Sequence, residues 1–189
     1  MKKGKNIKEN YVGAAYKNYD SFMILSHFKG HAMGGFGGAI KNMAIGIASS
    51  QGKIWLHSAG KYKKLGFRAI ISFFTIKEPF LESMAEAAGS IMDDLGENIV
   101  YINVMNNLSI ECDCVKNPKE PEMHDIGILA SLDAVALDKA CVDQVYAVKD
   151  KSSESLKKRI ESRNGMHTLN HAESLGLGSQ SYKLIRIDG

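Results

Sequence analysis

Three short apolar runs constrain the fold of this chain more than any other feature. Residues 22–25, 99–105 and 126–130 are nearly continuous in apolar side chains, and each has the length of a β-strand. A strand that is apolar on both sides is typical of a sheet covered on both faces. Segments with a helical spacing of apolar residues separate these runs, at about residues 38–49, 80–95 and 133–148. The alternation predicts an α/β fold with a mainly parallel sheet flanked by helices, forming part of a larger α/β architecture.

Other segments indicate how the rest of the chain is organised. The length of 189 residues predicts a single α/β domain. The lysine-rich start predicts a flexible basic tail over residues 1–10, and residues 61–79 are expected to be an irregular, atypical segment. Further strands are expected at residues 53–56, ending at His57, and at residues 182–187.

The composition excludes several functional classes. The net charge is only +3, and no basic stripe is interleaved with aromatic residues, so no nucleic-acid partner is expected. The apolar runs are strand-sized, and the basic start is not followed by an apolar core. We therefore expect neither a membrane partner nor a signal peptide. Three cysteines in a chain of this length do not make a disulfide scaffold, which predicts a reducing, cytoplasmic location.

The segment richest in functional residue types is residues 26–42, Ser-His-Phe-Lys-Gly-His-Ala-Met-Gly-Gly-Phe-Gly-Gly-Ala-Ile-Lys-Asn, between a predicted strand and a predicted helix. Binding sites in α/β proteins are built at such junctions. Glycines let a ligand approach the backbone closely, and the N–H groups of a helix start favour anions. The residues expected to bind a cofactor or an anionic small molecule are Gly34, Gly35, Gly37, Gly38 and Lys41. The alternative is a tight, closely packed turn from strand to helix.

Three histidines accompany this loop. His27 and His31 follow the first strand, and imidazole titrates near neutral pH, so both are candidates for catalytic acid–base groups or metal ligands. His57 ends the next predicted element and is a candidate metal ligand if that element returns to the same edge of the sheet. For His57 alone, a solvated loop residue is the alternative.

Two cysteines form a second candidate site. Cys112 and Cys114 lie in the sequence Glu-Cys-Asp-Cys, within a long loop at residues 106–121. Thiolates and carboxylates bind soft or borderline transition metals, but this spacing is not that of zinc ribbons or ferredoxins. Two free thiols in a loop are an equally good interpretation. The third cysteine, Cys141, follows the apolar stripe of a predicted helix and is expected in the core.

A further pair of histidines, His167 and His171, has the spacing of one helix face, with Glu173 nearby. Thr168 is a candidate cap that would leave His167 outside the helix. We therefore favour a structural role for this pair.

The 26–42 loop resembles a known family when it is taken together with several later motifs. These are Asn-Val-Met-Asn-Asn at residues 103–107, Cys-Asp-Cys at 112–114, Asp-Ile-Gly-Ile-Leu-Ala-Ser at 125–131 and Leu-Gly-Leu-Gly-Ser at 175–179. The chain is similar to the uncharacterised iron–sulfur centre proteins called domain of unknown function 362, over residues 11–60 and 80–188. The resemblance implies no assigned activity. Members carry ferredoxin-type cysteine motifs after the region of His57 and a further stretch before Tyr11. This chain has no such motifs, so no ferredoxin-type cluster is expected.

A more distant resemblance is chemically sharper. Residues 31–41 resemble the segment of nickel-pincer lactate racemases that joins an acid–base histidine to a cofactor-tethering lysine, and the later step to His57 also matches. The resemblance implies that His31 is the acid–base group, Lys41 the cofactor anchor or anion contact, and His57 a metal ligand. The racemases take a second acid–base histidine from a preceding domain, for which only His27 is available here.

Three hypotheses follow. The first is a metal- or cofactor-dependent site on the 26–42 loop plus His57, with an unidentified cofactor that includes a transition metal among its candidates. The second is a non-catalytic metal or redox module that uses Cys112 and Cys114. The third, compatible with either, is an incomplete domain that forms a homo-oligomer or needs a partner chain. The sequence leaves open whether the protein is an enzyme.

Overall fold

The computed structural model describes residues 4–112, 115–117 and 119–187 and confirms the α/β fold. Its main sheet has the strand order β1 (Phe22–His27), β4 (Ile99–Met105) and β5 (Gly127–Ser131). β1 and β4 are parallel, whereas β5 runs antiparallel to β4. The sheet is therefore mixed. No helix crosses over between β4 and β5 among the residues described there, and a strand that returns without a crossover pairs antiparallel.

The 26–42 loop contains a small second sheet. β2 (Lys29–His31) and β3 (Gly35–Gly37) form an antiparallel hairpin in which His31 pairs with Gly35. Phe28 and Phe36 stack with ring centroids 5.5 Å apart and anchor the hairpin in the core. The hairpin holds the histidine and the glycines in fixed positions relative to each other.

The helix expected at residues 38–49 is divided. It comprises α1 (Ala39–Lys41) and a π-helical turn (Asn42–Gly46), and Ser49 then caps a new helix, α2 (Ser50–His57). Residues 53–56 are helical, so the strand expected there is wrong. The Ser49 hydroxyl accepts a hydrogen bond from the Gly52 N–H at 3.1 Å, a capping interaction that starts a helix. His57 consequently lies at a helix C-terminus.

The remaining helices are α3 (Phe67–Thr75), α4 (Glu78–Leu95), α5 (Ala134–Ala147), α6 (Glu154–Ser162) and α7 (Met166–Ser174). Of these, α4 and α5 match the helices expected at about residues 80–95 and 133–148. Asp133 caps α5 by accepting from the N–H groups of Val135 and Ala136. α3 lies inside the segment expected to be irregular. Residues 182–187, expected as a strand, belong to no strand among the described residues.

The beginning of the chain is held in place, which corrects the expectation of a flexible tail over residues 1–10 for the part described from residue 4 onward. Ile7 is fully buried, and its N–H donates to the Glu86 carboxylate at 2.9 Å. A 3₁₀ turn (Ala14–Asn18) then leads into β1. The chain from residue 4 onward therefore forms part of the packed structure.

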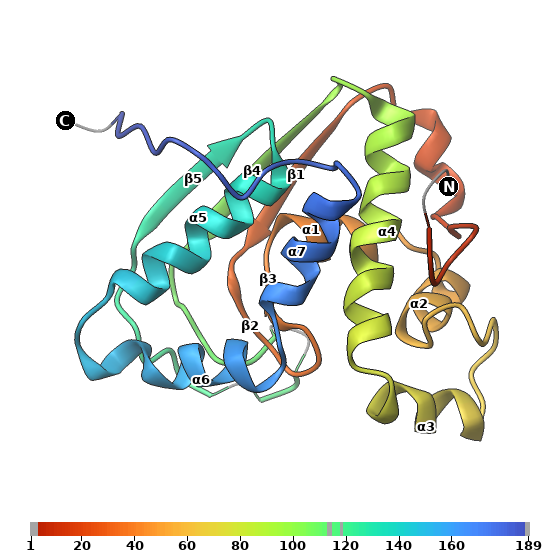
Figure 1. The fold of residues 1–189 in the computed structure, drawn as a ribbon, viewed down its shortest axis with the longest axis horizontal. Helices are drawn as coiled ribbons and strands as arrows, with labels where there is room; N and C mark the ends of the chain where they lie inside the picture. The colour runs from red at the N-terminus through yellow and green to blue at the C-terminus, as the bar shows by residue number, and fades with distance from the viewer. Residues whose placement is uncertain (1–3, 113–114, 118, 188–189) are drawn as a thin grey trace.

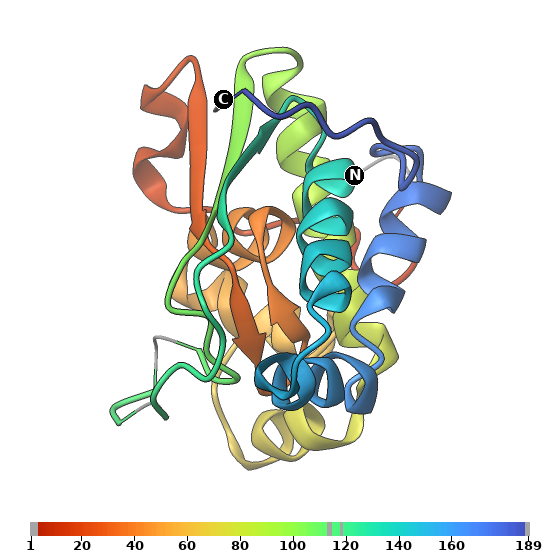
Figure 2. The same ribbon diagram turned by 90° about the vertical axis from the view of Figure 1, so that its left-hand side faces the viewer.

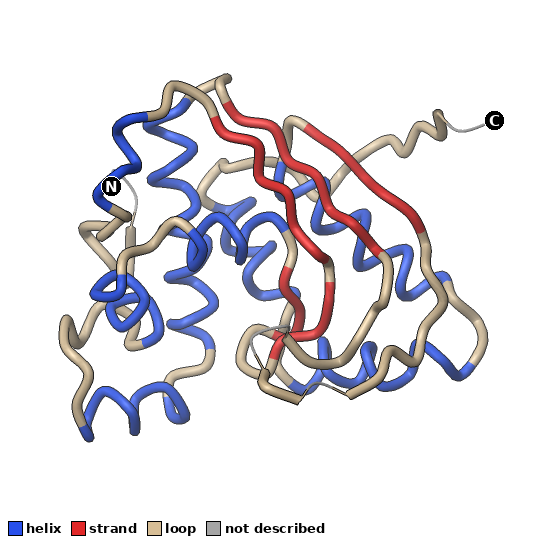
Figure 3. The backbone as a smooth tube through the Cα atoms, turned by 180° about the vertical axis from the view of Figure 1, so that it is seen from behind, coloured by secondary structure: helices blue, strands red, loops and turns tan. Residues whose placement is uncertain are grey.

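Helices cover one face of the main sheet (Figures 1 and 2). Seen from behind, the three strands lie in front of the helices and no described helix crosses them (Figure 3). The core lies between the sheet and α4 and α5, and it includes Ile24, Tyr101 and Met84. β5 is half-exposed rather than the buried strand that its apolar run predicts. None of the helices in the described part of the chain is long and apolar enough to cross a membrane.

Candidate functional site

The hairpin places His31 at the end of β2, within the 26–42 loop. Only 9% of the His31 surface is exposed, and its Nδ1 accepts a hydrogen bond from the Gly34 N–H at 2.9 Å. Because a backbone N–H can only donate, Nδ1 carries no proton, and in the neutral ring the proton lies on Nε2. His31 thus presents an N–H donor, and no residue that the structure describes bonds to that Nε2.

The surroundings of His31 keep its ring neutral. Burial is the main cause that lowers its pKa to about 3, and positive charge from Lys41, His57, Lys29 and Arg159 lowers the pKa further. An imidazole with this pKa is uncharged at neutral pH. Lys41 and His57 thus lie near enough to His31 for their charge to lower its pKa, although the three residues come from β2, α1 and α2.

His57 offers the opposite hydrogen-bonding character. Its Nδ1 lies 2.6 Å from the carbonyl oxygen of Lys53, which can only accept, so Nδ1 is protonated and Nε2 has a free lone pair. The ring stacks on Phe80 of α4 with centroids 5.0 Å apart. Burial lowers the pKa of His57, the bond to Lys53 opposes that shift, and Lys41 lowers it again. His57 is therefore a neutral acceptor beside a neutral donor.

Lys41 connects this pair to the cysteine loop. Its Nζ lies 3.9 Å from Sγ of Cys112, a buried cysteine that forms no disulfide with the described residues. Lys41 is half-buried, and no carboxylate of the described residues forms an ion pair with it. Cys114 lies outside the described residues. The site therefore gathers one cation, one thiol and two neutral imidazoles.

The glycines of the loop have structural reasons that the sequence did not reveal. Gly35 has φ +81°, and a Cβ there would lie 2.9 Å from Cα of Gly165. A Cβ on Gly38 would lie 2.2 Å from a carboxylate oxygen of Asp138. Gly34 donates to His31, and Gly37 packs along the Lys41 side chain. The closely packed turn therefore explains Gly35 and Gly38, and whether the four glycines also bind a ligand stays a prediction.

Asp138 occupies the helix start that was expected to bind an anion. Its carboxylate accepts from the N–H groups of Ala39 at 2.7 Å and Ile40 at 3.0 Å. These two amides are therefore unavailable to a ligand. An anion at this site would therefore have to bind to Lys41 and its neighbours.

His27 does not join the cluster. Its Nε2 contacts the carbonyl oxygen of Asn106 at 2.6 Å, and it is absent from the groups whose charge affects His31. Successive side chains of a strand point to opposite faces, and Ser26 is the one that points into the core. His27 therefore lies on the outer face of β1, and a shared acid–base role with His31 gains no support from this position.

A family model described as Domain of unknown function (DUF362) matches residues 1–143. The chain belongs to this family. The match begins before Tyr11 and includes residues 61–79, both outside the expected resemblance, and it ends at residue 143, so it does not cover the expected part beyond that residue. No curated protein and no solved structure matches the chain. The likeness to lactate racemases therefore stays a prediction.

The residues that support the 26–42 loop from the core were not predicted from the sequence. Asn103 of β4 donates to Asp138 at 2.8 Å, and both side chains are buried. Burial raises the pKa of Asp138 to about 6, against the hydrogen bonds from Asn103, Ile40 and Ala39. A usable signal was present, because Asp138 lies between the core residues Leu137 and Cys141. Arg159 of α6, whose charge lowers the pKa of His31, had no signal in the sequence.

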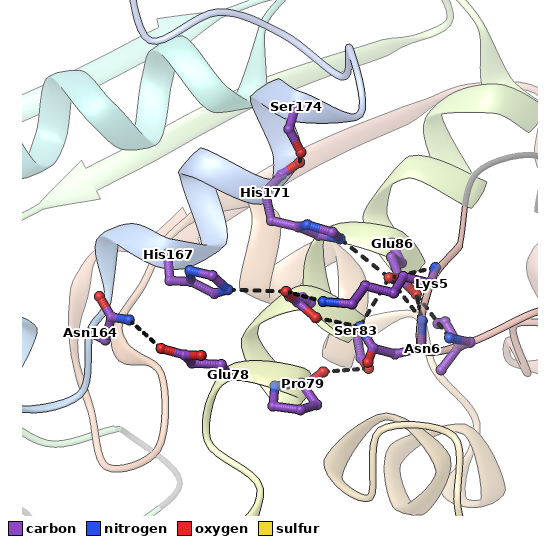
Figure 4. A network of polar contacts seen from close by, with 12 residues as sticks. Lys5, Asn6, Glu78, Pro79, Ser83, Glu86, Asn164, His167, His171 and Ser174 are labelled. Carbon is purple, nitrogen blue, oxygen red and sulfur yellow. Dashed lines mark hydrogen bonds and ion pairs between the residues drawn. The ribbon is translucent and has the colours of Figure 1, made fainter.

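The second histidine pair forms a separate polar network (Figure 4). His167 lies inside α7, so Thr168 does not separate it from His171 as a cap would. The two rings bond to Glu82 at 3.3 Å and Glu86 at 3.2 Å. Within the described ranges, no group of three or more His, Cys, Asp or Glu side chains has the geometry of a metal site. The expected structural role fits this network, which joins α7 to α4.

Proposed function

We propose that the protein binds a small anionic ligand or cofactor in the site formed by His31, Lys41, His57 and Cys112. The observation that carries the proposal is Lys41, a half-buried cation with no carboxylate partner among the described residues. Burying an unpaired cation is costly, and an anion offsets that cost. Lys29 and Arg159 add positive charge around His31.

The two histidines narrow the class of ligand. His31 presents a donor at Nε2, and His57 presents an acceptor at Nε2. A short hydroxy carboxylate satisfies all three groups, with its carboxylate on Lys41 and His31 and its hydroxyl donating to His57. The lone pair that can accept a proton then belongs to His57 rather than to His31, which was the expected acid–base group.

A metal centre is the weaker alternative. His57 Nε2 and the Cys112 thiol are two ligand atoms, but Lys41 lies 3.9 Å from that sulfur and repels a cation. The described residues supply no third ligand at this position. The two-cysteine redox module depends on Cys114, outside those residues. The proposal includes a reducing cytoplasm, since it needs the thiol form of Cys112.

The test is an NMR titration of the histidine ring protons with glycolate, acetate and inorganic phosphate. An anion near His31 stabilises the imidazolium, so the pKa of His31 should rise when the anion binds. Glycolate should bind more tightly than acetate, which lacks the hydroxyl. Lys41→Met should weaken binding about tenfold or more, the size expected for losing a charge-assisted contact.

The matched control is Lys61→Met, since Lys61 is exposed. This variant should bind like the wild type. If none of the three anions gives a saturable shift of the His31 and His57 signals, anion binding is wrong. Zn²⁺ that shifts the same signals stoichiometrically, and is lost in His57→Ala, would favour the metal centre instead.

A further inference from the structure

The outer face of the main sheet is apolar across all three strands. The strand register places Met23, Leu25 and His27 of β1 beside alternate residues of β4, and those beside alternate residues of β5. The outward side chains contributed by β4 and β5 are Val100, Ile102, Val104, Ile128 and Ala130. Figure 3 shows this face without a covering helix from the described residues.

Much of this face is open to water. Met23 is 63% exposed, Leu25 58% and Ile128 70%. None of its outward residues is Asp, Glu, Lys or Arg. Contiguous apolar patches of this kind mark interaction surfaces, whereas a solvent-facing strand surface normally alternates with charged residues.

A second apolar feature lies beside the same sheet. Residues 182–187 form no helix or strand, and Leu184, Ile185 and Ile187 are exposed. The Tyr182 hydroxyl donates to Asp143 of α5 at 2.8 Å, which fixes where the segment starts. Beyond that point it projects from the body on the β5 side of the sheet (Figures 1 and 3).

The size of the face indicates what can cover it. Strands of five to seven residues give a face of roughly 20 Å by 14 Å, about 280 Å². A stable interface buries about 800 Å² on each partner. The sheet face alone is too small, but a six-residue extended segment is about 20 Å long and can cross its width. Face and segment together approach the required area.

We propose that two copies of the chain associate through this sheet face, with residues 182–187 of each copy packing on the other. A two-fold interface pairs a surface with itself, and an uncharged apolar face is compatible with its own copy because no like charges meet. The projecting segment then gains the apolar cover that its own molecule does not provide.

The test is sedimentation equilibrium of the full chain over a range of concentrations. The wild type should dimerise. Substituting one exposed residue on each edge strand, Leu25→Lys with Ile128→Lys, should weaken dimerisation at least about a hundredfold, because both copies then place charges in an apolar interface. Removing residues 181–189 should weaken it at least about tenfold, because part of the buried area is lost.

Phe67→Ser is the matched control, because Phe67 is an even more exposed apolar residue on α3, outside this face. It should leave the dimer unchanged. Circular dichroism melting checks that each variant is folded, and Leu25→Ser with Ile128→Ser replaces the lysine pair if that pair does not fold. A wild type that stays monomeric at high concentration would overturn the proposal, as would dimerisation equally strong in the face variants. If the monomer instead floats with lipid vesicles, the face serves another partner and the proposal is wrong.

Discussion

A pair of histidines lies on each of two sides of α4, and the two pairs have opposite electrostatic surroundings. On one side His167 and His171 face the carboxylates of Glu82 and Glu86. On the other side His31 and His57 lie near Lys41, and the pKa of each is lowered by burial and then by neighbouring positive charge. The first pair has its partners inside the protein. The second pair has one donor and one acceptor that bond to none of the described residues.

Helix geometry separates these two sides. Residues two apart on an α-helix point about 200° apart, so alternate positions of α4 face opposite ways. Phe80 stacks on His57, and Met84 lies against the glycine loop, whereas Glu82 and Glu86 face the N-terminal segment and α7. The comparison teaches that a histidine pair must be judged by the charges that face it.

The largest expected effect is on the carboxylate side. Glu86 is buried and accepts from the N–H groups of Lys5, Asn6 and Ile7 and from His171. Glu86→Ala removes all these acceptor contacts and leaves buried donors unpaired, so the free energy of unfolding should fall by about 4 kcal/mol. Urea denaturation measures this loss. Glu97→Ala, at an exposed position after α4, should change it by less than about 0.5 kcal/mol. A similar small loss for Glu86→Ala would show that the network is not structural.

A smaller loss is expected on the glycine side. Gly35 has φ +81°, and a Cβ would approach Cα of Gly165 to 2.9 Å. Gly35→Ala should therefore cost about 2–3 kcal/mol, from backbone strain and from displacement of the turn before α7. Urea denaturation again gives the value. Gly66→Ala is the control, since nothing lies within 4 Å of a Cβ there. Equal stability of the two variants would contradict the packed turn that we assign to Gly35.

The sequence predicted the elements that depend on local signals. β1 and β4 follow from their continuous apolar runs, and α5 follows from the Asp133 cap. The strand predicted at residues 53–56 was wrong because four residues do not distinguish a strand from a helix. The Ser49 cap, which starts the helix, lies before those four residues. β5 looked buried because an apolar run does not show which faces of a sheet are covered.

The site was predictable only in part for a related reason. His31, Lys41 and His57 were found through one resemblance and their place along the chain, and the structure brings them together. The prediction that His27 belongs to the same group was not supported. The sequence shows that successive side chains of a strand alternate between its two faces, but it does not show which face is covered. The contact between Lys41 and Cys112 joins residues 71 positions apart and depends on how the long loop folds back. No local pattern contains that information.

The last effect, which is the smallest over a single pH unit, separates the two sides of α4 by pH. Burial, followed by the nearby cations, lowers the pKa of His31 from 6.5 to about 3, so the unfolded chain binds a proton in this interval and the folded chain does not. The free energy of unfolding therefore falls as the pH drops below 6.5, by up to about 1.4 kcal/mol per pH unit for one such group. On the other side, burial opposes ionisation of Glu82, but hydrogen bonds from Asn6, Lys5 and His167 lower its pKa from 4.5 to about 2. The loss due to Glu82 therefore begins only below pH 4.5.

Urea unfolding at several pH values distinguishes these contributions. His31→Asn, whose side-chain oxygen can still accept from Gly34, should reduce the slope between pH 6.5 and 4.5, and His57, whose pKa burial also lowers, should retain part of it. Glu82→Gln should leave that interval unchanged and reduce the slope only at lower pH. If both variants reduce the slope of the free energy of unfolding in the same pH interval, the two sides of α4 share one electrostatic environment. The contrast drawn between them is then wrong. Distinct intervals would mean that the buried charges facing each histidine pair, rather than the histidines themselves, decide which side is structural and which is open to a ligand.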